Sequence, residues 1–236
     1  MQHLIEANTA YTTHADPSAC ATTIDRNFVW TWSHMRAEAG RMIIAQQVFA
    51  PLTLLAALML TWGAEAQTIR IVALGDSNTA GFGVARQEAF PARLEAMLRM
   101  NGTDAEVQNA GISGDTTHGM SRRLDGAVPE GTRIVIIQGG YNDLRRGSSP
   151  AAVAANIEAI LSRLAARQIK AVLCGFYNEP WEVMARRYGA ILVPSSTCYD
   201  GQYRGFDGLH MNAAGHDVVA ARLLPVVQRS LRLPRR

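Results

Sequence analysis

The chain has 236 residues, of which 48% are hydrophobic and 18% are charged. This composition supplies enough apolar material for a folded core and excludes a largely disordered protein. The formal net charge is +3, and the basic residues are almost all arginines, spread along the sequence without a basic run that aromatic residues interrupt. We therefore expect no nucleic-acid partner.

The first 41 residues show no sustained hydrophobic periodicity, so we assign them no fold. We treat residues 1–41 as an unstructured extension, or as one that an over-long gene model has added. The sequence leaves three candidate start codons, Met1, Met35 and Met42, because the secretory pattern described next begins far from Met1.

Residues 42–66 have the three parts of a secretory signal peptide. Arginines precede the segment, its apolar core spans residues 48–62, and a small-x-small pattern ends at Ala66. We predict cleavage after Ala66, which leaves residues 67–236 as the mature domain. The alternative is an uncleaved membrane anchor over residues 43–62, although an apolar core of roughly 15 residues is short for a span of about 20.

Cleavage would place the mature domain in the periplasm or outside the cell, where disulfides persist. Its two cysteines, Cys174 and Cys198, both follow predicted strands. The sequence allows a bridge between them or two buried free thiols, since the geometry of a disulfide cannot be deduced from spacing.

The mature domain alternates between short apolar runs and amphipathic segments. The clearest strand covers residues 69–74 and stops abruptly at the sequence Gly-Asp-Ser-Asn over residues 75–78. Further strands are expected at residues 106–108, 133–138, 171–174 and 190–193, and helices at residues 88–100, 116–124, 150–166, 180–188 and 212–231. This alternation predicts an α/β protein, a three-layer α/β/α sandwich with a five-stranded parallel sheet.

Polar stretches fall at predicted strand ends and in the last loop, at residues 75–77, 112–116, 139–143 and 207–210. Ligands of open α/β sheets bind at the carboxyl ends of the strands. A serine nucleophile there needs a base and a group that orients the base, and His210 and Asp207 can supply them for Ser77. The N–H groups of Ser77 and Gly114 and the side-chain amide of Asn142 can stabilise an oxyanion.

These residues resemble the GDSL, or SGNH, hydrolase superfamily, whose four sequence blocks carry a Ser, a Gly, an Asn and a His, with an Asp three residues before the His. The resemblance covers most of residues 69–231. It implies strand order 2-1-3-4-5, a catalytic set of Ser77, Asp207 and His210, and an oxyanion hole of Ser77, Gly114 and Asn142. The run ISGDT at residues 112–116 and the signal peptide are most similar to the periplasmic thioesterase, lysophospholipase and arylesterase branch.

The sequence also departs from that branch. Asn78 stands where the name-giving motif has Leu, and Met211 follows the histidine where the branch usually has Pro. The segment of residues 175–189, which helps to wall the acyl site in that branch, is shorter here. Four aromatic residues are candidates for an acyl pocket, with core packing as the competing explanation: Phe82, Tyr141, Phe176 and Trp181.

We expect a serine esterase that hydrolyses carboxylic esters or thioesters of small molecules through an acyl-enzyme, without a cofactor or metal. Peripheral contact with lipid is a further expectation, and the oligomeric state is not predicted. Two alternatives remain, an O-acetylesterase acting on a carbohydrate or peptidoglycan and a secreted binding module without turnover. His118 and His216 lie in predicted helices, where we expect surface positions or positions behind the site.

Overall fold

The structure, a computed structural model, describes residues 67–176 and 181–233. The extension of residues 1–41, the signal peptide of residues 42–66 with its cleavage site at Ala66, and the alternative anchor of residues 43–62 all lie outside the described residues. None of the helices described between residues 67 and 233 combines the length and the hydrophobicity of a membrane-spanning segment.

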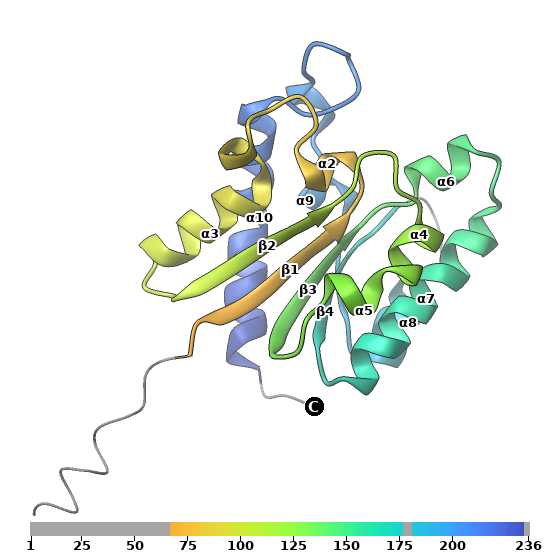
Figure 1. The fold of residues 1–236 in the computed structure, drawn as a ribbon, viewed down its shortest axis with the longest axis horizontal. Coiled ribbons are helices and arrows are strands. Elements are labelled where there is room, and N and C mark those ends of the chain that lie inside the picture. The colour runs from red at the N-terminus through yellow and green to blue at the C-terminus, as the bar shows by residue number, and fades with distance from the viewer. Residues whose placement is uncertain (1–66, 177–180, 234–236) are drawn as a thin grey trace, which may run out of the picture. The chain divides into compact units, whose positions relative to one another are not determined.

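The described residues form a parallel sheet with helices on both faces (Figure 1). The strands are β1 (Ile69–Gly75), β2 (Ala105–Gly111), β3 (Thr132–Gln138), β4 (Lys170–Cys174) and β5 (Ile191–Val193). Their order is β2-β1-β3-β4-β5, and each neighbouring pair is parallel. The predicted fold and strand order are therefore confirmed.

The central strands are buried on both faces, as their continuous apolar runs predict. Ile71, Val72, Ala73 and Leu74 of β1 are all fully buried. Because successive side chains of a strand point to opposite faces, Ile71 and Ala73 join one hydrophobic cluster, while Val72 and Leu74 join the other.

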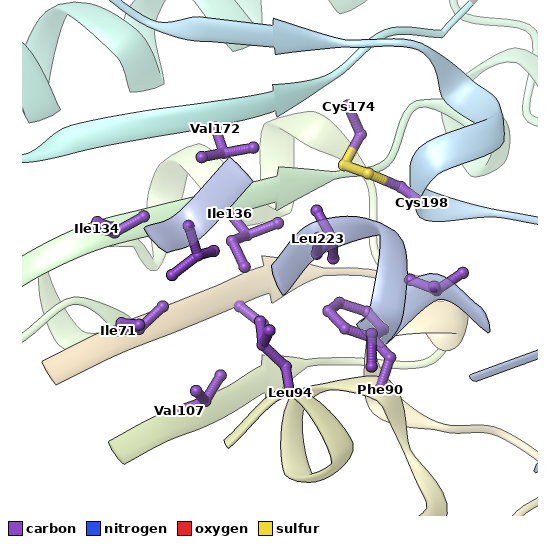
Figure 2. Close-up of a cluster of buried hydrophobic side chains, with 14 of the residues drawn as sticks. Ile71, Phe90, Leu94, Val107, Ile134, Ile136, Val172, Cys174, Cys198 and Leu223 are labelled. Carbon is purple, nitrogen blue, oxygen red and sulfur yellow. A yellow bond between two sulfur atoms is a disulfide. The ribbon is translucent and has the colours of Figure 1, made fainter. Parts of the chain in front are cut away.

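The first face of the sheet is covered by α3 (Phe90–Met100) and α10 (Ala213–Arg232) (Figure 1). Figure 2 shows Phe90 and Leu94 of α3 and Leu223 of α10 among the strand side chains of this cluster. The side chain of Asn212 caps the start of α10 by accepting a hydrogen bond from the N–H of Gly215 (3.1 Å), a position that asparagine favours.

The second face is covered by α4 (Thr117–Arg122), α5 (Leu124–Ala127), α7 (Pro150–Ala166) and α8 (Trp181–Tyr188) (Figure 1). Helix α7 begins with Pro150 at its first position, and its capping residue Ser149 accepts a hydrogen bond from the N–H of Ala152 (3.2 Å). Its buried side chains pack against β3 and β4 as part of the second cluster: Val153, Ile157, Ile160, Leu161 and Leu164.

The long elements follow the sequence prediction, and the differences concern short or edge elements. The expected helix over residues 116–124 is two helices, α4 and α5. The edge strand β2 is longer than predicted, because its second half carries polar residues that give no apolar run. The prediction missed five short helices, which have too few turns to show a period: α2 (Ser77–Ala80), η1 (Arg86–Glu88), α6 (Tyr141–Arg145), α9 (Ser195–Cys198) and η2 (Gly201–Tyr203).

Candidate active site

Three strands end at the same level of the sheet and bring the predicted sequence blocks together. Gly75, the last residue of β1, is paired in register with Gly111 at the end of β2 and with Gln138 at the end of β3. The residues that follow these strands therefore meet at one edge. In Figure 1, α2 and α6 lie at this end of the sheet, where the arrowheads point.

Ser77 lies in the turn where β1 ends and α2 begins. The turn needs glycine in the strands beneath it, since a Cβ on Gly75 would lie 2.1 Å from Oγ1 of Thr79 and a Cβ on Gly111 would lie 2.1 Å from the backbone N of Ala80. Helix α2 thus sits directly on two strand ends. Asp76 caps it by accepting a hydrogen bond from the N–H of Asn78 (3.1 Å).

Asp207, His210 and Ser77 are hydrogen-bonded in series. Nε2 of His210 lies 2.8 Å from Oγ of Ser77, and Nδ1 of His210 lies 2.5 Å from Oδ2 of Asp207. Oδ1 of Asp207 also accepts hydrogen bonds from the N–H groups of Leu209 (3.0 Å) and His210 (2.9 Å). The ring of Phe82 packs against the imidazole, with 4.5 Å between the ring centroids.

Two carboxyl groups of the site have pKa values that are shifted in opposite directions from the ordinary value. The hydrogen bond from His210, together with those from two backbone N–H groups, lowers the pKa of Asp207 to about 2. Asp207 is therefore a carboxylate at neutral pH, and as an acceptor it selects the tautomer of His210 that carries hydrogen on Nδ1. Burial raises the pKa of Asp76 to about 6, against the lowering effect of hydrogen bonds from Asn78 and Gln138.

The three predicted oxyanion donors line one cavity with Ser77 and His210. Among the hydrogen bonds of the described residues, none uses the N–H of Ser77 or of Gly114, so both donors are available. Gly114 has φ +79°, in the left-handed region that favours glycine. The amide of Asn142 donates one hydrogen to the carbonyl oxygen of Asp115 (2.9 Å), which leaves its second N–H for a ligand.

Two arginines hold the loop that carries Gly114. Arg123 donates to Oδ2 of Asp115 from Nε (2.8 Å) and to the carbonyl oxygen of Gly75 (3.1 Å), which joins the loop to the end of β1. Arg146 donates to the carbonyl oxygen of Gly114 (2.8 Å). The loop is therefore fixed relative to the serine turn through Asp115 and through the peptide that directly follows Gly114.

Asp143 anchors the helix that presents Asn142. Asp143 is 2% exposed, and its carboxyl group accepts hydrogen bonds from the N–H (2.9 Å) and the hydroxyl (2.6 Å) of Thr117. Asn156 of α7 donates to the same hydroxyl (3.0 Å). Because α6, α4 and α7 meet in this buried network, the position of Asn142 is set by the core rather than by a free loop.

The cavity above Ser77 has a volume of about 780 Å³. It is large enough for a small ester. Phe82, Tyr141 and Phe176 line it, as the sequence analysis expected. Trp181 does not belong to the lining; it is buried in the second hydrophobic cluster, where its indole N–H donates to the carbonyl oxygen of Phe176 (2.6 Å).

The residues of this site lie in a segment that matches a known protein family. The model of the GDSL-like Lipase/Acylhydrolase family matches residues 73–218, which contain every residue of the predicted catalytic set and oxyanion hole. The chain belongs to this family. It is an SGNH-type serine hydrolase acting on ester bonds, as predicted.

Relatives and solved structures of the family agree with this assignment. The chain is 35% identical to Esterase TesA of Pseudomonas aeruginosa over 150 residues, which cover 61% of this chain and 74% of the relative. It is 27% identical to Thioesterase 1/protease 1/lysophospholipase L1 of Escherichia coli K12 over 191 residues. This match covers 72% of this chain and 90% of the relative. The crystal structure of AlinE4, an SGNH-hydrolase family esterase, is 30% identical with a TM-score of 0.55, and the match covers 72% of this chain and all of AlinE4.

In this GDSL-family chain Cys174 and Cys198 form a disulfide, which resolves the alternatives that the sequence left open. Cys174, the last residue of β4, is bonded to Cys198 of α9, with 6.0 Å between the Cα atoms (Figure 2). Both residues line the cavity. The bridge therefore joins the sheet to the segment that leads into the loop of Asp207 and His210.

Sequence reasoning missed the part of the cavity wall that comes from residues 195–204. Ser195, Tyr199 and Arg204 line the cavity, yet their segment has neither periodicity nor a motif that could have revealed them. Of the two remaining histidines in the predicted helices, His118 is exposed. His216 is 1% exposed and accepts a hydrogen bond from the N–H of Phe90 (3.2 Å), so its role is in the core.

Proposed function

We propose that the protein hydrolyses carboxylic esters or thioesters of small molecules through an acyl-enzyme on Ser77. Oγ of Ser77 attacks the carbonyl carbon while Nε2 of His210 takes the hydroxyl proton. Asp207 holds the Nδ1–H group and stabilises the imidazolium that forms. The N–H groups of Ser77 and Gly114 and the free N–H of Asn142 stabilise the oxyanion of the tetrahedral intermediate.

The remaining steps use the same groups. The intermediate collapses when the bond to the leaving oxygen or sulfur breaks, and His210 gives its proton to that atom. The alcohol or thiol departs, leaving the acyl group on Ser77. His210 then takes a proton from water, whose oxygen attacks the acyl carbonyl, and returns the proton to Oγ of Ser77 as the carboxylic acid is released. The reaction therefore consumes only the ester or thioester and one water molecule, and it regenerates the hydroxyl of Ser77.

The observation that carries this proposal is the hydrogen-bonded series of Asp207, His210 and Ser77, of which Ser77 and His210 line the cavity. The series has the order and the distances that a serine nucleophile requires. The names of the relatives support the ester and thioester chemistry, since one is called an esterase and another a thioesterase and lysophospholipase.

The test is a series of p-nitrophenyl esters, from acetyl to palmitoyl, assayed with the wild-type protein and with Ser77→Ala. We expect turnover that the substitution abolishes, and the best chain length distinguishes an acetylesterase from an enzyme acting on longer acyl groups. Ser148→Ala is the matched control, because Ser148 is an exposed serine that does not line the cavity. Equal turnover in wild type and Ser77→Ala would overturn the proposal.

Covalent labelling separates the enzyme from a binding module that lacks turnover. A fluorophosphonate probe should label the wild-type protein and Ser148→Ala and should not label Ser77→Ala. If the folded wild-type protein neither takes up the probe nor cleaves an ester, the binding module becomes the better explanation.

We further propose that residues 42–66 direct the protein out of the cytoplasm and that cleavage follows Ala66. The disulfide between Cys174 and Cys198 supports this proposal, since disulfides persist in the periplasm and outside the cell. N-terminal sequencing of the protein isolated from its native cells tests it. A mature N-terminus at Gln67 is expected, whereas a peptide that retains residues 43–62 would favour the membrane anchor, and one from residues 1–30 would rule out a later start codon.

Peripheral contact with lipid is also proposed, at the rim of the site. Phe206 is 84% exposed and precedes Asp207, and the exposed Phe82 packs against His210. Exposed phenylalanine side chains can insert at the boundary between lipid headgroups and acyl chains. Sedimentation with phosphatidylcholine vesicles should therefore be weaker for Phe206→Ser than for wild type, and equal sedimentation would contradict the contact.

A further inference from the structure

The cavity wall carries an excess of positive charge close to the candidate active site. Two arginines, Arg145 of α6 and Arg204 of the loop before His210, line the cavity, and Asp76 is the only acidic residue among the described residues that do so. Asp76 is 2% exposed, and its carboxyl group accepts a hydrogen bond from the N–H of Asn78.

Neither cavity arginine has a carboxylate partner among the described residues. Other arginines of the domain do form such ion pairs within 4.0 Å, including Arg93 with Asp217, Arg123 with Asp115 and Arg222 with Asp200. The guanidinium groups of Arg145 and Arg204 therefore keep donors that the described residues do not neutralise. A concave site lined by one sign of charge attracts ligands of the opposite sign.

Arg145 lies beside a tyrosine that also lines the cavity, and Arg204 shares the neighbour Gly201 with a second such tyrosine, Tyr199. The guanidinium carbon of Arg145 lies 5.9 Å from the ring centroid of Tyr141. The guanidinium of Arg204 and the ring of Tyr199 both lie beside Gly201, at 3.4 Å and 3.5 Å from the position of a Cβ on that glycine. For Arg145, contact with the aromatic face restricts the long side chain and leaves its planar N–H groups available for a carboxylate or phosphate.

Each of the two arginines lies close in the sequence to a residue of the candidate site. Arg145 follows the oxyanion residue Asn142 by one helical turn, and Arg204 precedes the loop of Asp207 and His210. From this placement we infer that the site prefers esters that carry an anionic group, a carboxylate or a phosphate, which Arg145 and Arg204 bind while the ester carbonyl faces Ser77. The inference rests on the proposed function and narrows its substrate class.

The experiment compares matched pairs of esters that differ by one charge. On the acyl side the pair is 4-nitrophenyl hexanoate and 4-nitrophenyl hydrogen adipate; on the leaving-group side it is phenyl hexanoate and 4-carboxyphenyl hexanoate. The measured quantity is the ratio of kcat/KM for the anionic ester to kcat/KM for the neutral ester. The two pairs distinguish an anion on the acyl group from one on the alcohol.

We expect the ratio for at least one pair to fall about fivefold in Arg145→Gln and in Arg204→Gln, the effect of one solvent-accessible ion pair of about 1 kcal/mol. It should also fall in about 0.5 M NaCl, because salt screens exposed charges. Arg229→Gln is the control, since Arg229 is exposed on α10 and does not line the cavity. Ratios that stay at the wild-type value in both cavity variants, for both pairs, would overturn the inference.

A binding measurement tests the preference for anionic esters independently of whether the protein hydrolyses esters. Calorimetric titration of Ser77→Ala with the intact esters gives dissociation constants that do not depend on turnover. Tighter binding of the anionic member of a pair, lost in Ser77→Ala combined with Arg145→Gln and Arg204→Gln, supports the inference even if no ester is cleaved. Equal or weaker binding of the anionic ester overturns it even if the neutral ester is a good substrate.

Discussion

Tyr199 donates a hydrogen bond from its hydroxyl to the carbonyl oxygen of Leu209 (2.8 Å), and Leu209 directly precedes His210. Tyr199 itself follows Cys198, which is bonded to Cys174 at the end of β4. The loop that carries the candidate base is therefore tied to the central sheet through one side-chain hydrogen bond and one disulfide.

We predict that Tyr199→Phe lowers kcat by about tenfold with a smaller change in KM. The ring remains in the cavity wall, but the loop loses the bond that fixes the peptide before His210, and a misplaced base slows proton transfer. Steady-state kinetics on a p-nitrophenyl ester measure the two parameters separately. Tyr203→Phe is the control in the same loop, and a rise in KM at unchanged kcat would show that Tyr199 only contacts the substrate.

We predict that replacing both cysteines, in Cys174→Ala with Cys198→Ala, lowers the free energy of unfolding by about 3 kcal/mol. The bridge closes a loop with a sequence separation of 24 residues, and its loss frees that loop in the unfolded state. Urea denaturation measures the change. Dithiothreitol should destabilise the wild-type protein and leave the double variant unaffected, whereas equal midpoints for wild type and variant would show that the bridge contributes nothing.

Most of the fold and the central residues of the site could be predicted from sequence for a physical reason. Buried parallel strands are read from apolar runs such as β1, and the carboxyl ends of such strands must meet at one edge. Ser77, Gly114 and Asn142 each follow a strand, so their proximity results from topology. His210 and Asp207 lie in the last loop, and they could be predicted because a serine nucleophile needs a base with an orienting group and because they resemble a known motif.

The wall of the cavity could not be predicted in the same way. Residues 195–204 have no period, and short helices such as α9 leave no pattern in the sequence. Trp181 was a reasonable candidate for the pocket because it is aromatic. Its side chain on α8 instead packs in the second hydrophobic cluster. Arg145 and Arg204 resemble the other scattered arginines until the fold brings them to one cavity.

We predict that Asn142→Ala lowers kcat by about 10²–10³, the effect of losing one preorganised oxyanion donor. KM should change little, because the donor acts on charge that develops only in the transition state. Steady-state kinetics, with circular dichroism to check folding, test this prediction. Asn101→Ala provides a comparison outside the cavity, and kcat of Asn142→Ala close to wild type would remove Asn142 from the oxyanion hole.

Asp76 makes the stability of the protein depend on pH between about 4 and 6. Burial raises its pKa from the ordinary 3.8 to about 6, so the folded protein holds this proton more tightly than the unfolded chain does. The stability that this group contributes is fully present below pH 3.8 and is lost as the pH rises through 6. The loss amounts to about 3 kcal/mol at most, since one pKa unit corresponds to about 1.4 kcal/mol.

We therefore predict that Asp76→Asn is more stable than wild type at pH 7 and loses this advantage toward pH 4. The asparagine oxygen can still accept the hydrogen bond from Asn78 but carries no charge to bury. Urea denaturation of both proteins across this pH range gives the difference in unfolding free energy. Burial lowers the pKa of His216 to about 4, and this group titrates in both proteins and cancels in the difference. A difference that stays constant from pH 4 to pH 7 would mean that Asp76 is ionised throughout and that its charge is compensated within the fold.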